Sequence, residues 1–408
     1  MAGSRWWDRV VPLRHDKASV GTSTSPLYAD PPAEAGQHNG HHPAETIALA
    51  DDQGDGKTPR GKAVPGWGDG VLDKICGAYK LGTPSDWSVF AGAPREKRLL
   101  LTADGRKFVV RAVNGGSRGI LALEAELDLV EFLRSQHYPV AELVRTGAGS
   151  RYLSIRGYHY LMTVLEQAGP YDTSNRTHCV EAATGLAQFH EVTRDFAGTS
   201  PLGSAPYLMD VVEQRADWIE ATVRRYSAGD PAWGRTNHLL HALLGANDEL
   251  RALLPGIAAA YEGEPRTLIH GSYDRLALSF DGLGLAEVGN LDQVGLDVRL
   301  ADLSRSMLAF CTVEEGDEVS CIDMDPAIVS PFLASYEHVS PLSPLEVETL
   351  PLFLRAIHLA KVVDDARRLL KIPASDIAAE NHDRDARALC LALQLGYSPR
   401  QPRPEDSS

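Results

Sequence analysis

The sequence predicts an α+β protein with two lobes, a small antiparallel β-sheet lobe followed by a larger, mainly helical lobe. Between residues 84 and 164, short apolar runs are separated by turn signals such as Asp104-Gly105, which is typical of β-hairpins. After residue 177, apolar residues recur mostly at helical spacing. One compact hairpin, at 267–290, interrupts these helices, so we expect a few strands inside the helical lobe.

Composition narrows the class of protein. The chain has 408 residues, enough for one two-lobed domain with appendages. Its formal net charge of −15 argues against a nucleic-acid partner and against an anionic membrane surface. The five cysteines have no paired or metal-type spacing, and no apolar run reaches the length of a membrane span. We therefore expect a cytoplasmic protein.

The two ends of the chain differ from its middle. Residues 1–68 are dominated by Pro, Gly, Ser, Asp and His, and the tail 397–408 is similarly polar, so both are predicted to be disordered. The small lobe is then expected at 69–164 and the helical lobe at 165–396. The run Arg5–Val11, with two tryptophans, is either a docking segment for a partner or a chance aromatic cluster.

The small lobe has a strand that carries a charge and a helix that follows it. The strand Lys107–Val113 contains Arg111 directly after an apolar run. The segment Leu121–Gln136 places leucines and a valine on one face and acids elsewhere, which predicts an amphipathic helix containing Glu126. A later strand, Tyr158–Met162, is expected to lead into the hinge between the lobes.

The stretch Thr267–Met307 has the most informative pattern. A short strand ends in His270-Gly271, and a polar loop precedes a hairpin whose turn is Asp281-Gly282. Asp302 is then expected to cap a helix, because apolar residues follow it at helical spacing.

This order of elements resembles the catalytic core of the aminoglycoside phosphotransferase and choline kinase-like family, which has a protein kinase-like fold. In that family the loop has the pattern H-G-D-x-x-x-x-N, a hairpin ends in I-D-F or I-D-W, and a helix begins with Asp-Leu-Ala. His270-Gly271 and Asp302-Leu303 match. The resemblance implies that Arg111 holds nucleotide phosphates, that Glu126 pairs with it, and that a purine stacks near Met162 and Val164.

The three residues that carry the family's chemistry are replaced in the degenerate loop at 268–304. Ser272 stands where the family has its catalytic Asp, Ala277 where it has Asn, and Asn290 where it has the metal-binding Asp. A serine hydroxyl is too weak a base to replace a carboxylate, whose role contributes about 10²–10⁴-fold. Mg²⁺ prefers charged oxygen ligands, which Asn290 and Ala277 lack. We therefore expect ATP and Mg²⁺ binding to be weak or absent.

Two nearby acids leave an alternative open. Asp274 lies two residues after Ser272, and Asp292 lies two residues after Asn290. A shifted site would use Asp274 as base and Asp292 as metal ligand. In the other interpretation, Asp274 supports a turn and Asp292 is an ordinary loop or cap residue.

Two functions follow from these alternatives. The first is a pseudokinase-like binding or accessory protein in a bacterial pathway, with specialised metabolism as a candidate. Its partner would be a small-molecule ligand, a peptide or another protein. The second is an active ATP-dependent phosphotransferase with a rearranged site, acting on a hydroxyl of a small molecule or on Ser or Thr of a peptide. A third hypothesis is that the protein has an acidic cleft that binds a cationic ligand or a peptide without any phosphate chemistry.

Overall fold

The computed structural model describes most of the two expected lobes. The described residues are 70–89, 97–102, 105–114, 116–165, 168–198, 208–227, 237–312 and 324–370. The predicted disordered ends, which include the Arg5–Val11 run, lie outside them. None of the described helices is both long enough and apolar enough to cross a membrane.

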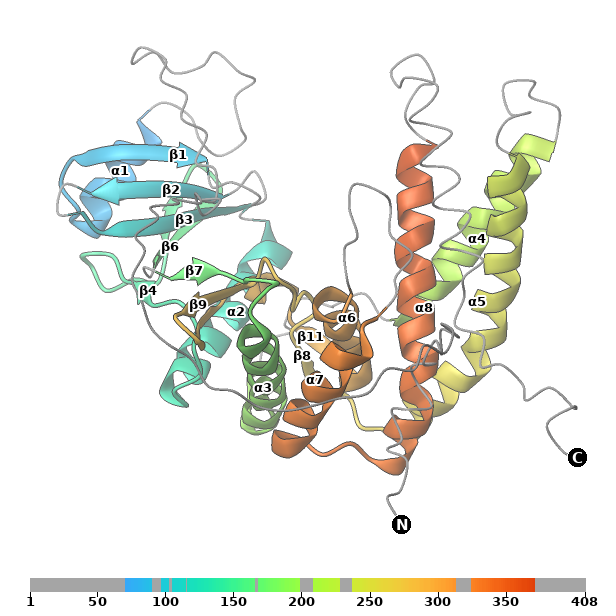
Figure 1. Ribbon diagram of the computed structural model, residues 1–408. Coiled ribbons are helices and arrows are strands. Elements are labelled where there is room, and N and C mark those ends of the chain that lie inside the picture. The colour runs from blue at the N-terminus through green and yellow to red at the C-terminus, as the bar shows by residue number, and fades with distance from the viewer. Residues whose placement is uncertain are drawn as a thin grey trace, which may run out of the picture.

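The small lobe is an antiparallel sheet with two helices (Figure 1). The strand order is β1-β2-β3-β6-β4, with β5 also paired to β6. The elements are α1 (Val71–Tyr79), β1 (Pro84–Val89), β2 (Lys97–Thr102), β3 (Lys107–Asn114), α2 (Ser117–Ser135), β4 (Leu143–Val144), β5 (Leu153–Ile155) and β6 (Tyr158–Val164).

The two faces of this sheet are covered by different helices. Side chains alternate along a strand, and directly paired residues share a face. Val110 and its partner Met162 pack with α1, whereas Arg111 and its partner Leu161 face α2. The sheet thus directs one arginine of β3 toward the helix that carries Glu126.

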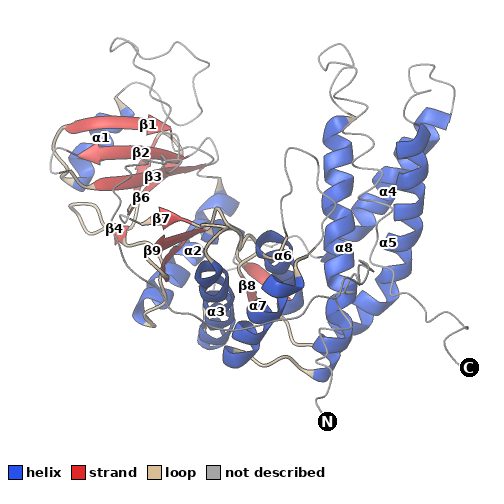
Figure 2. Ribbon diagram, in the orientation of Figure 1, coloured by secondary structure: helices blue, strands red, loops and turns tan. Residues whose placement is uncertain are grey.

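The second lobe is mainly helical and contains two small sheets (Figure 2). Its strands are β7 (Gly169–Pro170), β8 (Thr267–Ile269), β9 (Leu278–Asp281), β10 (Gly284–Val288) and β11 (Gly295–Asp297). Its helices are α3 (Arg176–Val192), α4 (Leu208–Ser227), α5 (Asn237–Gly263), α6 (Arg299–Phe310), α7 (Pro326–Val339) and α8 (Pro344–Leu369), with short 3₁₀ turns η2 (Thr193–Asp195) and η4 (Leu291–Gln293). The predicted α+β, two-lobed fold class is confirmed.

The helices of this lobe form two groups in Figure 1. Long helices α4, α5 and α8 pack against one another, whereas α3 packs against α7, β8 and β10, and α6 packs against β8. Buried aliphatic and aromatic side chains of both groups belong to one continuous core. The loop between β8 and β9 packs against this core through its buried residues Tyr273 and Ala277.

Several element boundaries differ from the sequence prediction. Helix α2 begins at Ser117, four residues before its predicted start at Leu121, and β9 begins at Leu278 because the preceding residues form a turn. The prediction that Asp302 caps a helix is wrong. Helix α6 begins at Arg299 with Val298 at the cap, so Asp302 lies inside the first turn. Its side chain is used elsewhere.

Candidate functional site

Asp302 organises the loop that follows β8. Its carboxylate is fully buried and accepts hydrogen bonds from the backbone N–H of His270 at 2.8 Å and of Gly271 at 3.0 Å. His190 of α3 donates from Nε2 at 3.2 Å, and Nδ1 of the same ring lies 2.6 Å from the Tyr336 hydroxyl. His190 is therefore a packed, hydrogen-bonded core histidine.

The charge of Asp302 is stabilised despite its burial. Burial acts to raise the pKa of the Asp302 carboxyl, but the hydrogen bond from His190 and the nearby His190, His270 and Arg305 together hold that pKa below its usual value. A buried carboxylate that accepts several N–H groups is a strong local organiser, because each bond is charge-assisted. Asp302 thus fixes where the loop begins.

His270 ties the loop to the end of the β9–β10 hairpin. Its Nδ1 accepts the backbone N–H of Ser272 at 3.4 Å, so Nε2 carries the proton and donates to the carbonyl of Gly289 at 2.9 Å. Burial lowers the pKa of His270, in agreement with a neutral ring. Gly271 has a φ of +79°, and a Cβ there would lie 2.3 Å from the carbonyl oxygen of Gln293. Only glycine fits this crossing.

Two of the replaced positions contact each other. The Ser272 hydroxyl donates to the backbone carbonyl of Asn290 at 3.3 Å. The loop after β8 and the end of the β9–β10 hairpin therefore meet at these two positions. The contact joins the Ser272 side chain to the backbone of Asn290.

The third replaced position, Ala277, is a buried methyl group. Ala277 is 5 % exposed, and its carbonyl accepts the backbone N–H of Gly289 at 2.7 Å. Asp274 lies in the same turn, where Oδ1 accepts the N–H of Leu276 at 2.9 Å and of Ala277 at 3.2 Å. This is the pattern of a turn-supporting aspartate. It gives Asp274 a structural role in the loop.

Arg111 and Glu126 form the ion pair that the resemblance implies. One Arg111 nitrogen, Nη2, lies 2.6 Å from both carboxylate oxygens of Glu126, and the two side chains are 12 % and 14 % exposed. The pair joins β3 to α2 on the face that looks toward the second lobe. In kinases such a pair must be formed before the cation can hold nucleotide phosphates.

Asp292, two residues after Asn290, approaches this pair. Asn290 has φ 58° and ψ 36°, a left-handed conformation that asparagine and aspartate tolerate better than other side chains. Asp292, in η4, places Oδ1 3.8 Å from Nη1 of Arg111 and is 36 % exposed. The structure thus brings Arg111, Glu126 and Asp292 together across the two lobes.

The two residues expected beside a purine lie on the other face of the sheet. Met162 is fully buried and Val164 partly buried in the cluster that packs with α1. Leu161 instead shares the Arg111 face and packs against α2. Side chains alternate along β6, and the residue paired directly with Arg111 shares its face of the sheet, so Leu161 and not Met162 lies on that face.

The oxygen ligands do not fit a kinase-type Mg²⁺ site at the family's positions. Ala277 has no donor atom, and Asn290 brings a neutral amide. Among the described residues, no group of three or more His, Cys, Asp or Glu is arranged to hold a metal ion. Of the two candidate metal ligands, Asn290 and Asp292, only Asp292 carries a charge.

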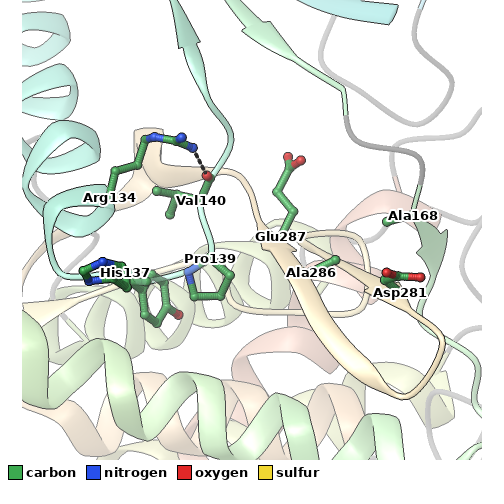
Figure 3. A pocket seen from close by; sticks show the side chains of 9 residues that line it. Arg134, His137, Pro139, Val140, Ala168, Asp281, Ala286 and Glu287 are labelled. Atoms are coloured by element: carbon green, nitrogen blue, oxygen red, sulfur yellow. Dashed lines mark hydrogen bonds between the residues drawn. The ribbon is translucent and has the colours of Figure 1, made fainter.

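A cavity of about 530 Å³ lies between the end of α2 and the β9–β10 hairpin (Figure 3). Its lining residues are Arg134, His137, Tyr138, Pro139, Val140, Ala168, Asp281, Ala286 and Glu287. Arg134 donates to the carbonyl of Val140 at 3.0 Å within it. Arg111, Ser272 and Asn290 are not part of this lining, so the cavity is separate from the residues discussed above.

A two-lobed fold with a β3–α2 ion pair, a loop held by a buried aspartate and a hairpin ending at that loop defines the class. It is a kinase-like phosphotransferase fold, as the resemblance to aminoglycoside phosphotransferases and choline kinase-like proteins implies. No protein-family model matches the sequence.

Solved structures share the fold. An amicoumacin kinase, hAmiN, in complex with AMP-PNP, Ca²⁺ and Ami is 15 % identical, with 81 % of this chain and 94 % of that chain covered and a TM-score of 0.57. An aminoglycoside phosphotransferase from Alicyclobacillus acidocaldarius is 14 % identical, with 82 % and 97 % covered and a TM-score of 0.53. A microcompartment-associated aminopropanol kinase is 15 % identical, with 79 % and 96 % covered and a TM-score of 0.53.

A curated relative is similar in sequence. Homoserine kinase of Caulobacter vibrioides is 22 % identical over 303 residues, which span 70 % of this chain and 83 % of the relative. These likenesses confirm the predicted fold over most of the chain.

Proposed function

We propose that this protein is a pseudokinase-like, nucleotide-binding accessory protein. It keeps the phosphotransferase scaffold and the Arg111–Glu126 pair, but it lacks the groups for efficient metal-dependent phosphoryl transfer. Its biological role would then be to bind a small molecule, a peptide or a partner protein, with the nucleotide as a structural or regulatory ligand.

The contact between Ser272 and Asn290 carries the proposal. It supports the alignment of the loop and the hairpin end with the family's pattern, in which Ser272 and Asn290 are two of the replaced positions. A hydroxyl bonded to a backbone carbonyl offers no base, and the neighbouring Ala277 offers no ligand.

The Arg111–Glu126 pair supports nucleotide binding. The pair is partly buried and both nitrogen–oxygen contacts are 2.6 Å, so Arg111 is held ready as a cation for phosphate oxygens. An amicoumacin kinase of the same fold has been solved with AMP-PNP, which adds support for a nucleotide ligand.

Calorimetry with ATP, with and without Mg²⁺, tests the proposal. We expect ATP to bind, with an affinity that Mg²⁺ changes by less than about threefold, because charged metal ligands are missing. Arg111→Met is expected to weaken binding about 10- to 100-fold, the range for losing a charge-assisted bond of about 1.5–3 kcal/mol. Arg251→Met is a matched control. Arg251, on α5, also bridges two acids, Asp217 and Glu220 of α4, but it is not part of the Arg111–Glu126 pair. Absence of ATP binding under both conditions would contradict the proposal.

A second function is favoured by one observation, the approach of Asp292 to Arg111. An exposed carboxylate at this place would serve as a metal ligand in a working phosphotransferase with a rearranged site. Its acceptor would be a hydroxyl of a small molecule or of Ser or Thr in a peptide, and the similarity to a homoserine kinase supports an alcohol acceptor.

Transfer of labelled phosphate from ATP to protein or to candidate alcohols separates the two functions. Turnover that depends on Mg²⁺ and falls at least about 100-fold in Asp292→Asn would establish the second function. Asp274→Asn serves as the companion variant, since Asp274 already bonds two backbone N–H groups in its turn. Activity lost with Asp274→Asn alone would point to Asp274 as the base instead.

A further inference from the structure

Helix α2 is held on a second side, opposite the face that pairs with Arg111. Glu124, Asp128 and Glu131 recur at i, i+4 and i+7 and form one stripe of the helix. Arg151, just before β5, donates from Nη1 to Asp128 at 2.5 Å and from Nη2 to Glu124, and its Nη1 lies 3.6 Å from Glu131.

Two further side chains complete this contact. Arg145 donates to Glu131, and the Tyr152 hydroxyl donates to Glu124 at 2.7 Å. We call Arg145, Arg151 and Tyr152, together with the three acids of α2, the α2 clamp. Arg151 contacts three carboxylates while only 20 % exposed, which distinguishes it from a single exposed ion pair.

The loop that presents the clamp is itself fixed. The N–H of Thr146 bonds the carbonyl of Ser150 at 2.9 Å, and the N–H of Ser150 bonds the Thr146 hydroxyl at 3.0 Å. The N–H of Gly147 donates to the carbonyl of Ala78 in α1 at 2.7 Å. A continuous set of bonds therefore runs from α1 through this loop to the acidic stripe of α2.

We infer that the α2 clamp holds α2 where Glu126 can pair with Arg111, so that Arg151 is a positioning residue for the nucleotide site. In kinases the placement of this helix decides whether the pair forms. Here the helix is gripped by an arginine from each side, Arg111 of β3 and Arg151 of the loop before β5. The nucleotide-binding arrangement is therefore built in and requires no activating event.

This inference rests on the proposed function for its effect on nucleotide affinity, but not for its effect on α2. Hydrogen exchange of the α2 peptide, residues 117–135, in the nucleotide-free protein reports the clamp alone. We expect Arg151→Met to accelerate exchange there by about fivefold or more, since a network of several pairs is lost. The control Arg251→Met removes a similar two-acid bridge on α4 and α5 and is expected to leave α2 unchanged.

Affinity for AMP-PNP without metal is the second readout. Arg151→Met is expected to weaken binding about 3- to 10-fold although Arg151 does not contact Arg111. Arg151→Lys keeps the charge but loses the planar guanidinium that reaches several carboxylates, so its affinity should lie between those of Arg151→Met and the wild type. If Arg151→Met fails to fold, Tyr152→Phe removes one bond to Glu124 and is expected to show the same trend at smaller size.

Unchanged α2 exchange in Arg151→Met would overturn the inference, whatever the nucleotide does. Faster exchange with unchanged AMP-PNP affinity would also overturn it, because the clamp would then not position the site. A wild-type protein that binds no nucleotide would overturn the proposed function, and the exchange measurement alone would then decide whether the clamp positions α2.

Discussion

Replacing Asp302 tests whether the frame of the catalytic loop is held as described. Its carboxylate accepts three hydrogen bonds, from the N–H groups of His270 and Gly271 and from His190. Asp302→Ala leaves all three buried donors without an acceptor, and a buried unsatisfied donor costs about 1–3 kcal/mol. Allowing for some relaxation, we expect a loss of about 3–5 kcal/mol in the free energy of unfolding, the range for removing one partner of a buried charged contact.

Asp302→Asn separates charge from shape. With its carbonyl at the Oδ2 position, asparagine keeps the acceptor for His270 and His190 but turns an N–H₂ toward the N–H of Gly271. We therefore expect a smaller loss, about 1–3 kcal/mol. Urea unfolding gives the global value, and hydrogen exchange of the segment 268–276 reports the loop itself.

Asp281 provides the matched control for both variants. It is an exposed aspartate on β9, so Asp281→Ala is expected to change stability by less than about 0.5 kcal/mol. If Asp302→Ala were no more destabilising than Asp281→Ala, the loop would not depend on the buried carboxylate, and the reasoning from its hydrogen bonds would be refuted.

The remaining predictions concern pH and two backbone positions. Folding lowers the pKa of Asp302, so the stabilisation by its carboxylate is complete above the unfolded pKa of about 3.9 and is lost as pH falls through the folded pKa. The difference in unfolding free energy between wild type and Asp302→Asn should therefore be constant from about pH 5 to 7 and shrink below about pH 4. Urea unfolding at several pH values measures this difference. Gly271→Ala should destabilise the protein by more than about 2 kcal/mol, because its Cβ would meet the carbonyl oxygen of Gln293. Gly282 is also at positive φ but has open space around a Cβ, so Gly282→Ala should cost about 1 kcal/mol. Similar losses for both variants would contradict the close contact at Gly271. Asn290→Ala should cost about 1 kcal/mol in thermal unfolding and Asn290→Gly close to nothing, and the reverse order would contradict a left-handed conformation at this residue.

The overall plan could be predicted from the sequence because it depends on periodicity and turn chemistry. The strand of Arg111, the helix of Glu126 and the hairpin after His270 all lie where the pattern places them. The ion pair between Arg111 and Glu126 also forms as the resemblance implies.

Features that depend on contacts distant in sequence could not be read in this way. Asp302 has the local signature of a helix cap, yet its carboxylate serves the loop 32 residues earlier. The face of the sheet on which Met162 lies is set by the pairing register of β6 with β3, which joins residues about 50 positions apart. The α2 clamp joins residues 14 to 28 positions apart, and no local pattern marks Arg151 as the partner of α2.

Restoring the three replaced groups tests the central claim most directly. The variant Ser272→Asp, Ala277→Asn and Asn290→Asp is compared with wild type by calorimetry with ATP at saturating and zero Mg²⁺. If the frame is intact and only the reactive groups are missing, the restored protein should gain at least about tenfold in affinity from Mg²⁺, while wild type changes by less than about threefold. A wild-type protein whose ATP binding already rises tenfold with Mg²⁺, or a restored variant that gains nothing, would contradict the account.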